Sequence, residues 1–231
     1  MKNIVVLTGA GMSAESGIAT FRDADGLWEG HDVMEVATPE GFYNNPKLVL
    51  DFCNQRRAQL KEVQPNKGHK QLKYLEEKYN VQIITQNVDD LHERAGSTNV
   101  LHLHGELRKV KSTVNPNLIY NWEDDLFLGN LCEEKSQLRP DIVWFGEAVP
   151  MIDEAIKIVE NADILVIIGT SMQVYPAASL IDFVAPEVPL YFIDPNPTIK
   201  ESQYANLSII KEGAAKGVAK LIAILSSILE Y

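Results

Sequence analysis

Cysteine is scarce in this chain: Cys53 and Cys132 are the only two among 231 residues. Two cysteines cannot build a disulfide framework, and they are too few for a metal site made of four thiolates. Proteins of reducing compartments have this composition, so we expect a cytoplasmic protein. The first apolar run, residues 4–7, is too short for the core of a signal peptide, so no export is expected.

Long apolar runs and positive charge are also scarce. The longest uncharged stretch, residues 164–181, is divided by Gly169, Gln173 and Pro176 into a strand, a polar turn and the start of a helix. Lysine and arginine number 21 against 32 acidic residues, for a net charge of −11. A phosphate backbone would be repelled by this charge. We therefore expect neither a membrane nor a nucleic-acid partner, whereas small cofactors or basic peptides suit an acidic surface.

What is present is an ordinary globular composition, with 45% apolar and 23% charged residues. Continuous β-branched or apolar runs predict about six buried strands, and helical periodicity recurs between most of them. This alternation predicts an α/β fold with a doubly wound, Rossmann-like parallel sheet. The predicted strands are 4–8, 81–85, 100–104, 164–168, 190–193 and 207–210, and the predicted helices are 47–61, 68–79, 152–160 and 218–229.

Two intervals break the alternation. Residues 106–138 have no clear period and are interpreted as a small insertion module, and residues 22–41 as a flexible flap over a site. We predict one domain over residues 1–231. Its larger lobe comprises 1–30, 80–105 and 139–231, and its smaller lobe 31–79 and 106–138.

Glycine and polar residues follow five of the predicted strands. The turn at residues 8–17 permits close backbone approach, and the next helix would offer free N–H groups to a pyrophosphate. Alone this turn is a weak signal, because Ala14 replaces a glycine of the dinucleotide fingerprint. Similar clusters follow at residues 85–89, 104–106, 169–171 and 194–196. Since the carboxyl ends of parallel strands converge, these clusters should share one crevice.

Five stretches, in order from residue 9 to residue 177, match one known family: GAGMSAESGIATFRDADGLW, TQNVDD, LHLHGE, LRPDIVWFGE and GTSMQVYPA. In these the chain resembles the sirtuins, the NAD-dependent protein lysine deacylases, over nearly its whole length apart from the insertion. The resemblance implies that NAD is consumed as a cosubstrate and that the substrates are acyl-lysine proteins or peptides. It implies nicotinamide, O-acyl-ADP-ribose and free lysine as products.

The resemblance also implies roles for individual residues. His104, with a reference pKa of about 6.5, would be the general base that deprotonates the ribose, and Asn87 would contact the ribose and a water. Asp89 would hold the nicotinamide carboxamide. The implied cofactor site comprises Gly9, Ala10, Gly11, Ser13, Glu15, Thr20, Phe21, Arg22, Gln86, Asn87, Asp89, Gly169, Thr170, Ser171, Asp194, Asn196 and Ala215. The implied substrate site comprises Ala14, Cys53, Arg56, Val143, Trp144, Phe145 and Gly146, where residues 143–147 would pair with the peptide backbone.

Structural alternatives remain for several of these residues. His102 and His104 alternate onto one strand face, and we favour catalysis for His104 and a core position for His102. Asp89 and Asp90 could cap a helix. Residues 169–171 could form only a turn, and Trp144 could be a core residue whatever the function.

The chain departs from the sirtuin pattern in the insertion. Many sirtuins carry two CxxC pairs that bind structural zinc there. Here Ser112 and Asn115 align with the first pair, and Cys132 is the one cysteine in the interval, so no zinc is expected. We expect apolar packing to hold the insertion instead, through Leu118, Ile119, Trp122, Leu126 and Phe127.

A second departure concerns the acyl group. Ala14 and the helix at residues 51–57 resemble the class that reads succinyl and malonyl groups through Tyr-x-x-Arg. Arg56 matches the arginine, and Cys53 stands in place of the tyrosine. Arg56 could hold an acyl carboxylate, or it could be a solvated helix charge, and a small Cys53 could admit longer acyl chains. Asp194 likewise stands where the family often has asparagine.

These observations predict a protein deacylase that removes acetyl groups, with succinyl and malonyl groups as further candidates and a monomer favoured. An NAD glycohydrolase or ADP-ribosyltransferase of the same architecture is the alternative. A non-catalytic NAD sensor is the least favoured reading, because it would have no need of a base at His104.

Overall fold

The computed structural model describes residues 1–19, 27–28 and 30–229. Its main element is a six-stranded sheet in the order β11-β10-β9-β1-β4-β5, in which every neighbouring pair is parallel. The predicted doubly wound α/β class is therefore confirmed. The strands are β1 (Asn3–Thr8), β4 (Asn80–Thr85), β5 (Val100–His102), β9 (Ile164–Ile168), β10 (Leu190–Ile193) and β11 (Leu207–Ile210).

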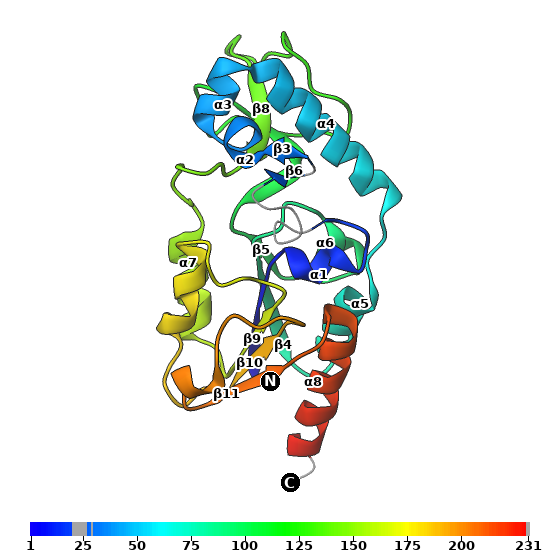
Figure 1. Cartoon of the computed structure of the whole chain (residues 1–231), viewed down its shortest axis with the longest axis vertical. Helices are drawn as coiled ribbons and strands as arrows, with labels where there is room; N and C mark the ends of the chain where they lie inside the picture. The colour runs from blue at the N-terminus through cyan, green and yellow to red at the C-terminus, as the bar shows by residue number, and fades with distance from the viewer. Residues whose placement is uncertain (20–26, 29, 230–231) are drawn as a thin grey trace.

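Helices cover both faces of this sheet, and β1 at its centre shows why its sequence is continuously apolar. Ile4 and Val6 belong to a core shared with α5 and α8, whereas Val5 and Leu7 face a second core under α7 and η2. Both faces of β1 are thus dry, as the unbroken β-branched run predicts. Figure 1 shows these layers on either side of the sheet. The helices are α5 (Lys67–Leu75), α7 (Ile152–Glu160), η2 (Ala177–Phe183) and α8 (Ala214–Leu229).

The strand order reverses direction at β1. From β1 the chain runs outward through β4 to β5, then returns to the other side of β1 for β9, β10 and β11. The β1/β9 boundary is therefore the switch point, where open α/β sheets bind ligands. Two short helices, α1 (Ala10–Ala14) and α6 (Leu91–Arg94), follow β1 and β4 along the chain. The short helix η3 (Glu201–Gln203) precedes β11.

A second, smaller group of elements lies beyond the carboxyl ends of the strands, at the opposite end of the molecule from α8 in Figure 1. It contains a three-stranded antiparallel sheet in the order β7-β6-β8 and a two-stranded ribbon. The elements are β2 (Leu27–Trp28), β3 (His31–Asp32), α2 (Val33–Val36), α3 (Pro39–Asn44), α4 (Pro46–Glu62), β6 (Gly105–Ser112), β7 (Ile119–Asn121) and β8 (Leu138–Ile142).

The small insertion module predicted at residues 106–138 is present, whereas the loop predicted at residues 22–41 needs correction. The interval 106–138 contains most of an antiparallel sheet, whose alternation was obscured because the β6–β8 register shifts between Glu106 and Val110. Residues 33–36 and 39–41 of the supposed loop are helical: Asp32 caps α2, and Thr38 caps α3 ahead of a proline at the helix start. These caps were signals in the sequence that the loop interpretation missed.

The lobes also differ in extent from those predicted. Helix α5, placed in the smaller lobe from the sequence, packs with α8 against the six-stranded sheet. Strand β8, most of which was placed in the larger lobe, pairs with β6 in the small sheet. None of the helices in the described part of the chain is long and apolar enough to cross a bilayer.

Candidate active site

Two glycine turns meet at the switch point. The N–H of Gly9 donates to the Ile168 carbonyl at 3.0 Å, and the N–H of Gly11 donates to the Gly169 carbonyl at 2.8 Å. A Cβ on Gly11 would lie 2.7 Å from the Gly169 Cα, and Gly169 itself has a φ of +62°. Only glycine fits this crossing. The chain itself therefore uses the N–H groups of both Gly9 and Gly11.

Behind this crossing lies a buried hydrogen-bonded network of three predicted site residues. The Asn87 side-chain amide donates to the Gly9 carbonyl and to Ser13 Oγ, each at 3.1 Å. Ser13 Oγ in turn donates to Asp89 Oδ2 at 2.8 Å. The ends of β1 and β4 are thus joined by side chains of the very residues that the sequence singled out.

Asp89 is a buried carboxylate with two roles. Burial raises its pKa, while hydrogen bonds from the Leu91 N–H and the Ser13 hydroxyl oppose that rise. The Leu91 N–H donates to Asp89 Oδ1 at 3.1 Å, so Asp89 also caps the start of α6. Asp90, at the N-cap position, makes no capping bond and lies 3.2 Å from Arg108 Nε instead. The capping interpretation therefore applies to Asp89, together with its place in the network.

His104 has the hydrogen bonding of a neutral base. Its Nδ1 lies 3.0 Å from the Gln86 carbonyl oxygen, which can only accept, so Nδ1 carries the proton and Nε2 the lone pair. No residue in the described part of the chain hydrogen-bonds Nε2. Burial lowers the pKa of His104, which keeps the ring neutral near pH 7. Gln86 also donates to Thr170 Oγ1 at 3.1 Å, which ties this strand end to the turn after β9.

Three more of the predicted cofactor residues, Asp194, Glu15 and Ala215, make hydrogen bonds within the protein. Asp194 is buried after β10, and its Oδ1 accepts the Asn196 N–H at 2.8 Å. Glu15 and Ala215, both predicted to contact the cofactor, also contact each other: Glu15 Oε1 accepts the Ala215 N–H at 3.0 Å. A carboxylate at the start of α8 satisfies an open helix amide and complements the helix dipole.

The predicted peptide segment closes the site from the small sheet. The Val143 N–H donates to the His104 carbonyl and the Phe145 N–H to the Ala37 carbonyl, each at 2.9 Å. Trp144 is buried beneath Arg139, whose guanidinium carbon lies 3.2 Å from the ring centroid. Gly146 and Phe145 are exposed beside it. A peptide strand added here must pair through backbone groups other than these two amides.

A family model of the Sir2 family matches residues 9–176. The chain belongs to the Sir2 family. An NAD-dependent protein deacylase of Helicobacter pylori is 67% identical over 195 residues, 84% of this chain and 85% of that protein. Another, of Bacteroides thetaiotaomicron, is 53% identical over 231 residues, 97% of this chain and 98% of that protein. A solved Sir2 homolog–NAD complex superposes with a TM-score of 0.87 at 41% identity, covering 99% of this chain and 91% of that chain.

Three of the predicted cofactor residues, Thr20, Phe21 and Arg22, lie outside the described residues. Residues 23–26 and 29 of the predicted flap lie outside them as well. Ala14 is exposed at the end of α1, and Ser171 follows the β9 turn, where its carbonyl accepts from Thr198 Oγ1 at 2.8 Å. Ala10 begins α1 between the two glycines.

In this Sir2 chain, Cys53 and Arg56 on α4 have very different surroundings. Cys53 is fully buried in the core that contains Trp144, and burial raises the pKa of its thiol to about 12. Arg56 is half-buried, with its guanidinium carbon 5.5 Å from the Phe52 ring centroid. Cys53 is thus an apolar core residue, while Arg56 keeps part of its side chain accessible.

The sequence did not predict that Arg57 has a structural role. It is buried, and it donates to the Leu107 carbonyl at 3.1 Å and to Asn54 Oδ1 at 2.8 Å. Asn54 in turn exchanges two hydrogen bonds with the Leu126 backbone, so α4 and the insertion are joined by polar contacts. The spacing of Leu50, Asn54 and Arg57 on one helical stripe was the available signal.

The insertion is held by both packing and hydrogen bonds. Leu126 is buried among Leu118 and Trp122, as expected, but Ile119 and Phe127 are 48% and 55% exposed, so their predicted packing role is wrong. The alternation of side chains along β7 places Ile119 and Asn121 on its exposed face.

The two positions that align with the first CxxC pair lie in a cluster with Cys132. Ser112 Oγ lies 2.7 Å from Ser136 Oγ, which lies 3.1 Å from Cys132 Sγ, and Ser112 also accepts the Asn115 N–H at 3.1 Å. Within residues 1–19, 27–28 and 30–229, no three His, Cys, Asp or Glu side chains form a metal-binding group.

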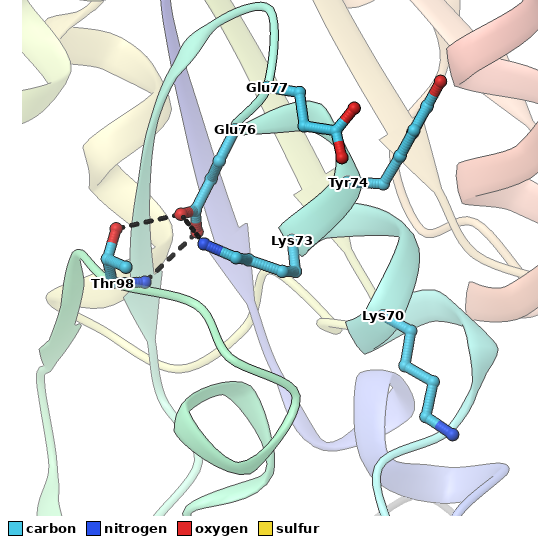
Figure 2. Close-up of a pocket in the computed structure, with 6 residues that line it drawn as sticks. All are labelled: Lys70, Lys73, Tyr74, Glu76, Glu77 and Thr98. Atoms are coloured by element: carbon cyan, nitrogen blue, oxygen red, sulfur yellow. Dashed lines mark hydrogen bonds and ion pairs between the residues drawn. The ribbon is translucent and has the colours of Figure 1, made fainter.

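A surface cavity of about 490 Å³ lies away from the candidate site, against α5 and Thr98. Figure 2 shows that Glu76 faces both Lys73 and Thr98 across it, with contacts of 2.8 and 2.9 Å. It contains none of the predicted site residues. Closer to the site, the sequence also missed a buried pair, His69 and His92, whose ring centroids are 4.8 Å apart.

Proposed function

We propose that this chain is an NAD-dependent protein lysine deacylase that forms nicotinamide, O-acyl-ADP-ribose and free lysine. The observation that carries the proposal is His104, whose Nδ1 is bonded to the Gln86 carbonyl, near the strand ends that also carry Asn87 and Asp89. The curated relatives are named for this activity, and a structural neighbour holds NAD. Both facts support the assignment.

The donor set suits a dinucleotide. Hydroxyls, side-chain amides and buried carboxylates lie at the ends of four parallel strands, from Ser13 through Gln86 and Asp89 to Asp194. Such groups match ribose hydroxyls and a carboxamide. NAD, as cosubstrate, would supply the ribose carbon that receives the acyl oxygen, and nicotinamide would leave.

The chain's own residues then have separate tasks. Asp89 and Ser13 orient Asn87, whose side-chain amide is held by Ser13 Oγ and the Gly9 carbonyl. His104 Nε2 accepts a proton from a ribose hydroxyl, a step that needs the neutral ring its burial favours. Trp144 and Phe145 form the wall along which the acyl-lysine peptide would lie.

For acyl choice, we propose acetyl removal with additional activity on succinyl and malonyl groups through Arg56. The Arg56 side chain is half-buried beside Phe52, with Nε and Nη1 buried, and a guanidinium pairs well with a carboxylate. Cys53 takes no part in that binding, because it is sealed in the core.

The experiment compares acetyl- and succinyl-peptides of identical sequence. Arg56→Met should raise the KM for the succinyl peptide while sparing the acetyl peptide. Lys61→Met, an exposed cation in the last turn of the same helix, is the matched control and should change neither KM. Equal losses on both peptides would contradict a role for Arg56 in reading the acyl carboxylate.

The glycohydrolase alternative is tested by nicotinamide release. A deacylase releases nicotinamide only when an acyl-peptide is present, whereas a glycohydrolase releases it from NAD alone. Peptide-independent release at full rate would overturn the proposed function.

A further inference from the structure

His102, two residues before His104, is held between two hydrogen-bond acceptors. Its Nδ1 lies 3.2 Å from the Asn87 carbonyl oxygen, and its Nε2 lies 2.8 Å from Glu93 Oε1. The His102 side chain is 9% exposed, whereas that of Glu93, at the surface end of the contact, is 40% exposed. His102 therefore bridges the solvent-facing carboxylate and the backbone of Asn87.

The two hydrogen bonds of the His102 ring determine how many protons the ring carries, and therefore its charge. A carbonyl oxygen and a carboxylate oxygen can only accept, so each ring nitrogen must carry a proton. A neutral imidazole has one such proton, and an imidazolium has two. The partly exposed Glu93 can stay ionised in water, which excludes the reverse arrangement with a protonated carboxyl donating to the ring.

The surroundings favour this charge. Burial alone lowers the pKa of His102, but the hydrogen bond and charge of Glu93 more than offset burial, and the net shift is upward. Glu106 on β6 adds to the upward shift, and the charge of His102 in turn opposes the rise in the pKa of buried Asp89. Lys109 pairs with Glu106 at 2.5 Å, and His92, which is kept neutral by burial, faces His102 from α6.

The target of the bridge is the residue at the centre of the site. The Asn87 N–H donates to Thr85 Oγ1 at 3.0 Å, and Thr85 Oγ1 accepts from Thr8 Oγ1 at 2.9 Å. With its carbonyl held by His102, both peptide groups that flank Asn87 are fixed. Its side-chain amide is then confined to the direction of Gly9 and Ser13.

We propose that His102, as an imidazolium paired with Glu93, is a positioning residue that fixes the Asn87 backbone for catalysis. This role rests on the deacylase function proposed above. It predicts that deacylation falls at alkaline pH, because one lost proton leaves a ring lone pair facing an acceptor.

Glu93→Gln tests the proposal with a nearly unchanged shape. The glutamine cannot stabilise the imidazolium, so the alkaline fall in kcat should move to lower pH, while the acid limb set by His104 stays in place. His102→Leu, which removes the donor to Asn87, should lower kcat by about tenfold to a hundredfold and leave the KM for the acyl-peptide nearly unchanged. His102→Asn, which can still donate, should restore part of kcat and flatten the alkaline limb. Glu123→Gln, an exposed carboxylate on Arg108, should change nothing.

A second readout does not depend on turnover. The ¹⁵N shifts of the His102 ring, in protein labelled at histidine and checked for folding by thermal melting, should show two protonated nitrogens near neutral pH and one in Glu93→Gln. A single protonated nitrogen in the wild type, or a wild-type kcat and pH profile in His102→Leu, would overturn the positioning role. Absence of any deacylation by a wild type with a charged His102 would overturn the proposed function instead.

Discussion

Removal of the Ser13 hydroxyl should be costly, because it serves a buried carboxylate. In the native site Ser13 Oγ donates to Asp89 Oδ2 at 2.8 Å, and Ser13 and Asp89 are both buried. A hydrogen bond to a charged group contributes about 1.5–3 kcal/mol. Ser13→Ala should therefore lower the free energy of unfolding by about 1.5–3 kcal/mol, even though Asn87 keeps its second partner, the Gly9 carbonyl.

The cost should also depend on pH. The folded-state pKa of Asp89 is already raised, chiefly by burial, and loss of the Ser13 donor raises it further. A carboxyl whose pKa is higher in the folded than in the unfolded state binds its proton more tightly when folded. Its unfavourable contribution is therefore absent at pH values below the unfolded pKa and grows as pH rises through the folded pKa.

Urea unfolding of the wild type and Ser13→Ala at acidic and near-neutral pH measures both effects. Ser16→Ala is the matched control: it removes a hydroxyl from the same turn, but one bonded to the neutral amide of Asn66 at 3.1 Å. That change should cost about 0.5–1.5 kcal/mol at either pH. A Ser13→Ala cost no larger than that of Ser16→Ala, or one independent of pH, would refute the reasoning.

Two further predictions concern the two cysteines and Trp144. Burial raises the thiol pKa of Cys53 to about 12, so Cys53 should resist alkylation in the folded protein. The Ser136 hydroxyl lowers the pKa of Cys132, so Cys132 should react first. Peptide mass mapping would contradict this prediction if Cys53 were labelled as fast as Cys132. Trp144→Ala should lower the unfolding free energy by about 3–5 kcal/mol, because the ring is buried under Arg139 at 3.2 Å. Denaturation that shows a loss below 1 kcal/mol would contradict the packing seen there.

The central sheet was predictable because its inner strands β1, β9 and β10 are buried on both faces, which requires a continuous apolar run such as residues 4–7. The small sheet was not, because β6 and β7 are only partly buried and the β6–β8 register is interrupted between Glu106 and Val110. The helices at 33–36 and 39–44 are so short that periodicity carries no signal, and only their caps mark them.

Much of the candidate site followed from topology alone, since polar residues after parallel strands must converge. That logic brought Asn87, Asp89 and His104 together without any knowledge of side-chain contacts. It could not show that Glu15 bonds to Ala215, 200 residues away, because that contact depends on where α8 begins relative to α1. Nor could it distinguish the surroundings of Arg56 and Arg57, which differ by one step around the same helix.

The most direct test of the account is mass spectrometry of one reaction that contains the protein, NAD and an acetyl-lysine peptide, run in parallel with His104→Asn. The wild type should yield nicotinamide, deacetylated peptide and O-acetyl-ADP-ribose, and the folded His104→Asn variant should yield no deacetylated peptide. ADP-ribose beside an intact peptide from the wild type, or wild-type product yield from His104→Asn, would contradict the central claim that His104 is the base of a deacylase.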